Sequence, residues 1–181
     1  MSLFTILADL ESNDELHEGR LLILLHAFSG DDGSKTIDGI TKLAKLDFLL
    51  RYPVYLERAL AAKGKNTKNV AVAEHERHSI ESKMVRYRFG PWDHRYRRFI
   101  NLLAARGLVH VTVDGRTIKI GLTEAGLTYS SQLREYDSFS DMTTRASLIH
   151  RNFDILGTNL MKFIYATFPE VVELRLGEEI D

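Results

Sequence analysis

The chain has 181 residues, of which 44% are hydrophobic, and its formal net charge at pH 7 is −1. It contains no cysteine, which excludes disulfide bonds, thiolate nucleophiles and cysteine-bound zinc. No apolar run approaches the roughly 20 residues that a membrane span needs, and the start of the chain carries acids where a signal peptide carries lysine or arginine. We therefore expect a cytoplasmic protein that does not enter the membrane and buries one substantial core.

The first predicted helix covers about 14–28. Ser12 and Glu15 fit a capping box at its start, leucines recur at helical spacing along it, and the turn "SGDDGS" ends it. The two adjacent carboxylates in that turn are expected to cap or terminate helices, not to catalyse. A second helix is predicted over about 37–51, because its apolar residues form one broad face.

Pro53 either ends the second helix or opens a third over 54–62. The polar stretch that follows has the least core-like composition in the chain, and we predict an insertion near 63–82 that contains at most a short strand or helix. Within it, His75 and His78 have a spacing that puts two imidazoles on one helical face. No third ligand stands at a recognisable spacing, so no metal is expected.

Sharper signals follow in the middle of the chain. A helix with one apolar side is predicted over 93–107, and alternating runs on either side of Asp114 and Gly115 predict a β-hairpin. A further helix is expected over about 123–136. Three helices followed by a two-stranded wing is the order of a winged helix-turn-helix.

We therefore predict a mainly α fold with a small β-hairpin wing. A winged helix-turn-helix core would occupy residues 1–136, and a C-terminal helical extension residues 137–181, with helices over about 140–153 and 158–168. The last of these helices is apolar around more of its circumference than one core face requires. It is either buried or docks a partner, and the candidate docking residues are Leu160, Ile164 and Phe168.

Charge is strongly segregated along the chain. Residues 1–32 hold seven acids and one arginine, residues 83–106 hold seven lysines and arginines against one acid, and the last thirteen residues hold five acids and one arginine. These charges either solvate separate faces and attract one another, or the basic middle forms a patch that binds a polyanion. The pattern leaves both interpretations open.

The candidate contact residues lie on the polar side of the helix over 93–107, where a winged helix has its recognition helix. They are Arg95, Arg97, Arg98 and Asn101. Arginines at this position contact phosphates and base edges when the partner is DNA. The same side chains also suit an acidic surface on a protein partner, or plain exposure to solvent.

Asp47 and Arg51 stand four residues apart, inside the apolar arc of the second predicted helix. Charges in such a place need partners, because burying an unpaired carboxylate is costly. We expect a structural, partly buried ion pair that also ties this helix to Arg86 and Arg88. The alternative is a contact to a protein partner.

Three segments carry a family resemblance: "TKLAKLDFLLRYPVYLERAL", "MVRYRFGPWDHRYRRFINLLAARGLVHV" and "IGLTEAG". Together they resemble the middle components of bacterial ABC-three-component systems, in particular the small accessory subunit of Lamassu-type antiphage defence. The resemblance covers roughly residues 20–135. It implies a small winged-helix protein without catalytic activity that binds an SMC-like or Rad50-like ATPase and helps couple nucleic-acid sensing to an effector subunit.

Enzyme templates are missing from the sequence. It has no Walker-type phosphate loop, no serine elbow and no HExxH motif, so we expect neither catalysis nor a bound cofactor. Two functions remain. The first is an accessory subunit that bridges the ATPase to the effector, with double-stranded DNA as a possible contact through the complex. The second is a winged-helix transcription regulator that binds paired DNA half-sites as a symmetric dimer.

Overall fold

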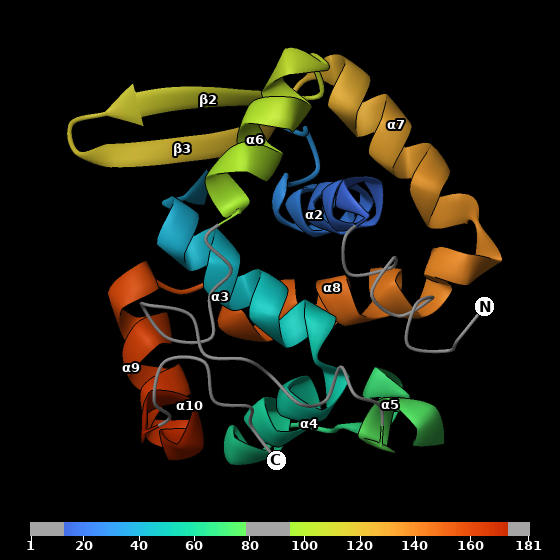
Figure 1. Ribbon diagram of the computed structural model, residues 1–181, viewed down its shortest axis with the longest axis vertical. Coiled ribbons are helices and arrows are strands. Elements are labelled where there is room, and N and C mark those ends of the chain that lie inside the picture. Colours follow the sequence, from blue (N-terminus) through green and yellow to red (C-terminus); the bar gives the residue numbers. More distant parts are fainter. Residues whose placement is uncertain (1–12, 79–94, 174–181) are drawn as a thin grey trace.

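The protein is mainly helical, with one small antiparallel sheet (Figure 1). The computed structural model describes residues 13–78 and 95–173. In chain order the elements are α2 (Asp14–Phe28), β1 (Ile37–Asp38), α3 (Ile40–Arg51), α4 (Pro53–Ala62), the 3-10 turn η1 (Lys68–Val70), α5 (Glu74–His78), α6 (Tyr96–Ala105), β2 (Val109–Asp114), β3 (Thr117–Leu122), α7 (Glu124–Glu135), η3 (Asp137–Phe139), α8 (Ser140–Phe153), α9 (Gly157–Thr167) and α10 (Pro169–Glu173). The predicted mainly α fold with a small β wing is confirmed.

Helix α2 is the central element of the core, with α3, α6, α7 and α8 packed around it (Figure 1). Its run Leu21–Leu25 is buried on every side of the helix, because neighbours cover the whole circumference. The helix has the predicted bounds, but its cap is Asn13, whose Oδ1 accepts from the N–H groups of Glu15 (3.0 Å) and Leu16 (3.3 Å). The predicted cap, Ser12, lies outside the described residues.

The second helix begins later than predicted. Residues 37–38 form the short strand β1, which pairs with β3 so that Ile37 lies opposite Ile120. Gly39 then has φ of 97°, which only glycine adopts easily, and its N–H donates to the carbonyl of Ile118 at 2.7 Å. Helix α3 starts at the next residue, and Pro53 opens α4 at the first helical position, where a missing N–H costs nothing.

The three strands lie in the order β1-β3-β2, and the β2–β3 hairpin projects from the helices as the wing (Figure 1). The predicted hairpin is confirmed, but its turn is one residue later than expected. Asp114 pairs with Thr117, so Gly115 and Arg116 are the central residues of the turn. Only Gly115 has positive φ (61°), as in a type II′ turn, whereas a turn centred on Asp114 and Gly115 would be of type I′, with positive φ at both residues.

Residues 63–78 of the predicted insertion contain η1 and α5, which Arg145 of α8 attaches to the core. Residues 79–82 lie outside the described residues. The buried guanidinium of Arg145 donates to the carbonyls of Val70 (2.8 Å) and Ala71 (3.0 Å) and to the carboxylate of Glu76 (2.8 Å). Because the partners are backbone carbonyls as well as a carboxylate, the segment is held in one conformation.

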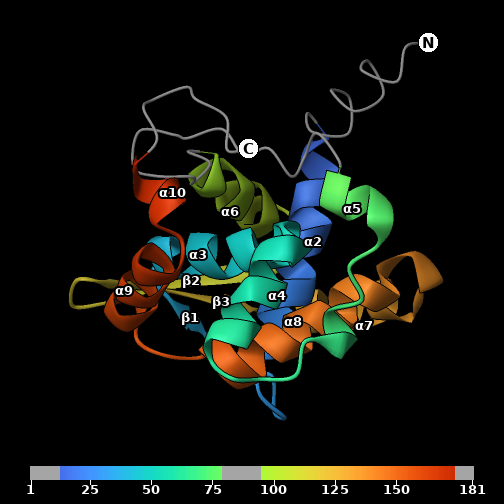
Figure 2. The ribbon, with the colours of Figure 1, turned by 90° about the horizontal axis from the view of Figure 1, so that it is seen from below.

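The C-terminal helices belong to the same hydrophobic core as α2 and α3. Helices α9 and α10 lie at one side of the molecule and α7 at the opposite side in both views (Figures 1 and 2). Leu160, Ile164 and Phe168 are 0% exposed, so the prediction that they dock a partner is wrong. The reason is that α9 packs against α3 and α4, where the Phe168 ring lies 5.0 Å from that of Tyr55.

Candidate interaction surface on helix α6 and the wing

Helix α6 separates its side chains into a buried side and an exposed side, as its sequence predicted. Tyr96, Phe99, Ile100 and Leu103 are buried at helical spacing. The opposite side exposes Arg97, Arg98 and Asn101 to solvent. Arg95 lies just before the helix, partly buried, with its guanidinium 5.5 Å from the centre of the Phe99 ring.

The buried side of α6 is fixed by the carboxylate of Asp47 on α3, which is 0% exposed. Tyr96 donates its hydroxyl to Oδ2 of Asp47 at 2.5 Å. Arg20 of α2 donates from Nε to Oδ1 (2.6 Å) and from Nη2 to Oδ2 (2.8 Å). This bidentate geometry joins α2, α3 and α6 at one buried point, which we call the Asp47 cluster.

The arginine that binds Asp47 is therefore Arg20, in contrast to the predicted Arg51. A spacing of four residues brings Arg51 to the same side of α3, but its guanidinium lies 5.4 Å from the centre of the Tyr52 ring. Its charge still contributes to lowering the pKa of Asp47. The other expected partners, Arg86 and Arg88, lie outside the described residues.

Electrostatics within the Asp47 cluster favour the ionised carboxylate. Burial alone would raise the pKa of Asp47, but the charge and hydrogen bonds of Arg20 and the Tyr96 hydroxyl bring it below the ordinary value. Burial, together with the negative charge of Asp47, raises the pKa of Tyr96 well above the ordinary value. The phenol thus stays a donor, and the carboxylate an acceptor, across the physiological pH range.

His17 extends this cluster toward α6. Its ring stacks on Phe99 with 5.1 Å between centroids, and its Nδ1 lies 3.0 Å from Nη2 of Arg20. A guanidinium can only donate, so Nδ1 accepts and the imidazole carries no proton on that nitrogen. The orientation of α6 is thus set by hydrogen bonds and ring packing together.

Acidic side chains of α2 neutralise part of the basic surface. Arg98 pairs with Asp14 (Nη2 to Oδ2, 2.5 Å), and Arg106 pairs with Glu18 (Nη1 to Oε2, 2.7 Å). This arrangement supports the interpretation in which the acidic and basic segments attract each other. Within residues 13–78 and 95–173, Arg97 makes no hydrogen bond or ion pair and stays open to a partner.

Glu18 is the least satisfied group of this region. Its side chain is buried, and Oε1 has no hydrogen-bond partner. Burial raises the pKa of Glu18, and the charge of Arg106 only partly offsets that effect.

The wing adds apolar surface beside this basic helix. Val111 is 42% exposed and Val113 is 72% exposed, and both belong to β2. Arg116 at the turn is also exposed, whereas Lys119 is paired with Asp114 at 2.9 Å. The surface of α6 and the wing therefore mixes one open arginine of the helix, one of the turn and exposed valines.

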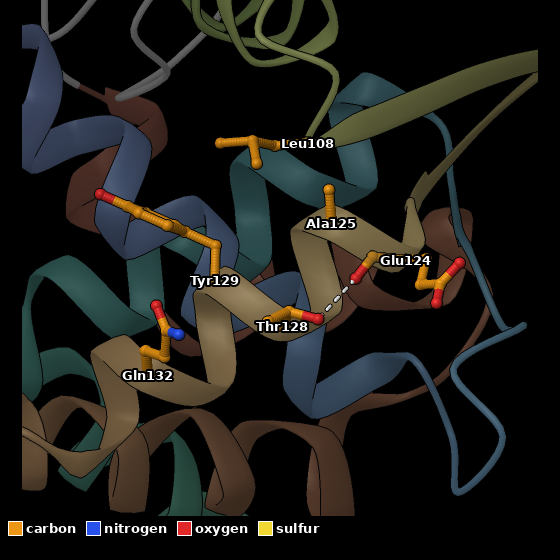
Figure 3. A pocket seen from close by; sticks show the side chains of 6 residues that line it. All are labelled: Leu108, Glu124, Ala125, Thr128, Tyr129 and Gln132. Atoms are coloured by element: carbon orange, nitrogen blue, oxygen red, sulfur yellow. Dashed lines mark hydrogen bonds between the residues drawn. The ribbon is translucent and has the colours of Figure 1, made fainter.

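A shallow pocket of about 510 Å³ lies along α7, next to the end of the α6–β2 connection (Figure 3). It is lined by Leu108, Glu124, Ala125, Thr128, Tyr129 and Gln132. The Thr128 hydroxyl donates to the carbonyl of Glu124 within the same helix at 3.1 Å, so it is already satisfied. The titratable side chains of the lining are Glu124 and Tyr129.

Among residues 13–78 and 95–173, no three histidine, aspartate or glutamate side chains come together where a metal ion could bind. In the same residues, no helix combines the length and the apolar composition of a membrane span. His75 is exposed on α5.

Comparisons with protein-family models, with curated proteins and with solved structures gave no match for this chain. The likeness to the Lamassu accessory subunit thus depends on the sequence segments quoted above. Two of them map onto neighbouring parts of one structure: the first covers α3 and α4 with Asp47, and the second contains α6.

Proposed function

We propose that this chain is an accessory subunit without catalytic activity of an SMC-like or Rad50-like ATPase complex in antiphage defence, and that it binds its partner through the surface of α6 and the wing. The observation that carries the proposal is the composition of that surface. Arg97 and Asn101 are exposed on α6, and Val111 and Val113 are exposed on the wing, which follows α6 in the sequence. Exposed aliphatic side chains next to a few open polar groups are typical of protein interfaces.

The pairing of the arginines favours a protein partner over DNA. A recognition helix that binds phosphates needs free cations, but Arg98 and Arg106 are already neutralised by Asp14 and Glu18. The two carboxylates would also repel a phosphate backbone brought near them. A protein partner can contact the open Arg97 and leave both ion pairs intact.

The resemblance supplies the identity of the partner. The resembling segments contain Asp47 and the whole of α6 with Tyr96, which help to position the proposed surface. In this role the winged helix connects the ATPase to an effector subunit, and DNA is reached through the assembled complex.

Co-purification tests the proposal. The full chain is expressed with the SMC-like or Rad50-like ATPase that the proposal predicts in a neighbouring gene, and the mixture is separated by size-exclusion chromatography with mass measurement. We expect both proteins in one peak and little binding of the isolated chain to a DNA duplex at physiological salt.

The alternative, a transcription regulator, predicts a different result. The isolated chain would then bind a palindromic duplex as a homodimer, and its affinity would fall steeply as salt is raised, because bound counterions are released from the DNA. That result, without co-purification of the ATPase, would replace the accessory-subunit proposal.

A further inference from the structure

Strand β2 forms an edge of the sheet. In the order β1-β3-β2 its only partner among the described residues is β3, and no other strand of residues 13–78 or 95–173 pairs along its outer side. The strand is six residues long, and the side chains of Val111–Asp114 are all exposed. An exposed edge of this kind presents unpaired backbone N–H and C=O groups in a row.

The register identifies the residues that present these groups. Asp114 and Thr117 flank the two-residue turn, so they exchange hydrogen bonds with each other, and the hydrogen-bonded pairs recur at every second residue along β2. Val113 and Val111 therefore lie in the alternate pairs and direct their N–H and C=O groups away from β3. The other neighbour of β3 confirms this alternation. Ile118 lies opposite Val113, and its carbonyl faces away from β2 and accepts from the N–H of Gly39, next to β1.

The sequence of β2 lacks most of the usual protections of an edge strand, and its one acid, Asp114, lies at the turn and is paired with Lys119. "VHVTVD" has no lysine, no proline and no glycine, and its pairing with β3 is continuous, without a bulge. The two valines whose backbone groups face outward, Val111 and Val113, also have exposed side chains, at 42% and 72%. Backbone and side chains thus offer one template on which an added strand can pair.

We propose that the outer edge of β2 binds an extended, acidic segment of a partner protein, which adds a fourth strand to the sheet. This proposal rests on the proposed function, since it describes how the accessory subunit holds its partner. Backbone hydrogen bonds to Val111 and Val113 supply the contact, and alternate apolar side chains of the partner cover the two valines.

Charge decides between a foreign segment and a second copy of this chain. Residues 95–119 form a basic region in which Arg97 and Arg116 make no ion pair within the described residues, whereas Arg98, Arg106 and Lys119 are paired with Asp14, Glu18 and Asp114. Pairing β2 with β2 of another copy would bring two such basic regions together, and like charges repel. An acidic segment gains attraction from Arg97 and Arg116 instead.

Amide hydrogen exchange tests the proposal on the full chain. In the chain alone, the amides of His110 and Thr112 are expected to be protected and those of Val111 and Val113 to exchange rapidly. The probe is a short synthetic peptide with blocked ends that alternates valine and glutamate. We expect it to protect Val111 and Val113 selectively, and to bind more tightly than a peptide with lysine in place of glutamate.

A matched pair of variants separates backbone pairing from side-chain contact. Val113→Pro removes only an outward-facing N–H, so the β2–β3 ladder stays intact, whereas Val113→Thr keeps that N–H. We expect about tenfold weaker peptide binding for Val113→Pro, the effect of one net hydrogen bond, and little change for Val113→Thr. Protection of His110 and Thr112 in both variants checks that the hairpin is folded.

Three results would overturn the proposal. The peptide could leave the exchange of Val111 and Val113 unchanged, the lysine peptide could bind equally well, or both amides could be protected in the chain alone, increasingly so with concentration. The last result would show pairing with a second copy. An ATPase complex that forms while both amides still exchange rapidly would contradict only this inference, and peptide protection without an ATPase complex would contradict only the proposed function.

Discussion

Two of the polar contacts that attach helix α6 to α2 differ in their surroundings. In the Asp47 cluster, the tyrosine of α6 and the arginine of α2 meet on one carboxylate that is 0% exposed. In the other pair, Arg98 of α6 meets Asp14 of α2, and the arginine side chain is 64% exposed. The two contacts have similar lengths but unequal consequences for stability.

The difference explains how the same helix can hold the fold and also carry the proposed contact surface. A buried charge is costly to leave alone, so the Asp47 cluster holds α2, α3 and α6 in one arrangement. Exposed pairs are screened by water and contribute little to stability. The buried side of α6 therefore sets its orientation, and the exposed side is free to serve recognition.

The largest expected effect is that of breaking the Asp47 cluster. Asp47→Asn leaves the buried guanidinium of Arg20 without its counter-charge, and we expect a loss of about 3 to 5 kcal/mol in the free energy of unfolding. Denaturant titration measures this loss. Glu170→Gln is the control, because that carboxylate pairs with Arg58 at the surface and its removal should cost less than about 1 kcal/mol. Equal losses in the two variants would contradict the comparison.

A smaller effect is expected from Tyr96→Phe. This change removes one hydrogen bond to a charged acceptor, while Asp47 keeps both contacts from Arg20, so the loss should be about 1.5 to 3 kcal/mol. The same titration measures it. If the variant and the wild-type protein have the same free energy of unfolding, the Tyr96 hydroxyl does not stabilise the packing of α6 on α3.

Lys45 provides a pH-dependent test of burial on α3. Its side chain is buried, and this burial lowers its pKa from 10.5 to about 8. Between these values the unfolded chain binds more protons than the folded one, so stability should rise with pH, by at most about 1.4 kcal/mol per pH unit. The measurement is thermal unfolding of the wild-type protein and of Lys45→Met between pH 8 and 9.5, which lies below the ordinary pKa of tyrosine. If the stability of both proteins changes equally with pH, the lowered pKa of Lys45 is contradicted.

The smallest expected effect is that of Arg98→Ala. An exposed ion pair contributes about 0.2 to 1 kcal/mol, and added salt screens it. The free energy of unfolding should therefore fall by no more than this amount, and the difference from the wild-type protein should shrink at high salt. A loss as large as that of Asp47→Asn would show that the exposed pair also holds the fold.

Local signals were sufficient for most of the helices. The spacing of apolar residues and the capping residues predicted the ends of α2, α7, α8 and α9 to within one or two residues. Pro53 marked the start of α4. The strand β1 was missed because two residues carry no periodic pattern. Ile37 and Asp38 are extended only because β3, far along the chain, supplies their partner.

The candidate site was predictable in part. Amphipathic spacing identified the exposed Arg97, Arg98 and Asn101 correctly, because which side of a helix is polar is a local property. The partner of Asp47 was not local, and the i, i+4 rule pointed to the wrong arginine. A usable signal existed in "GRLLILL", where Arg20 stands at the edge of an apolar run and needs a buried acid.

The most direct test of the account is the dissociation constant of the complex between the full chain and its ATPase. Arg97→Glu reverses the open charge of α6, and Arg151→Glu reverses an exposed arginine on α8 that makes no hydrogen bond or ion pair within the described residues. We expect Arg97→Glu to weaken binding at least tenfold, with unchanged thermal unfolding, and Arg151→Glu to bind like the wild-type chain. Equal affinity of the wild-type chain and both variants would contradict the assignment of the interface to α6 and the wing.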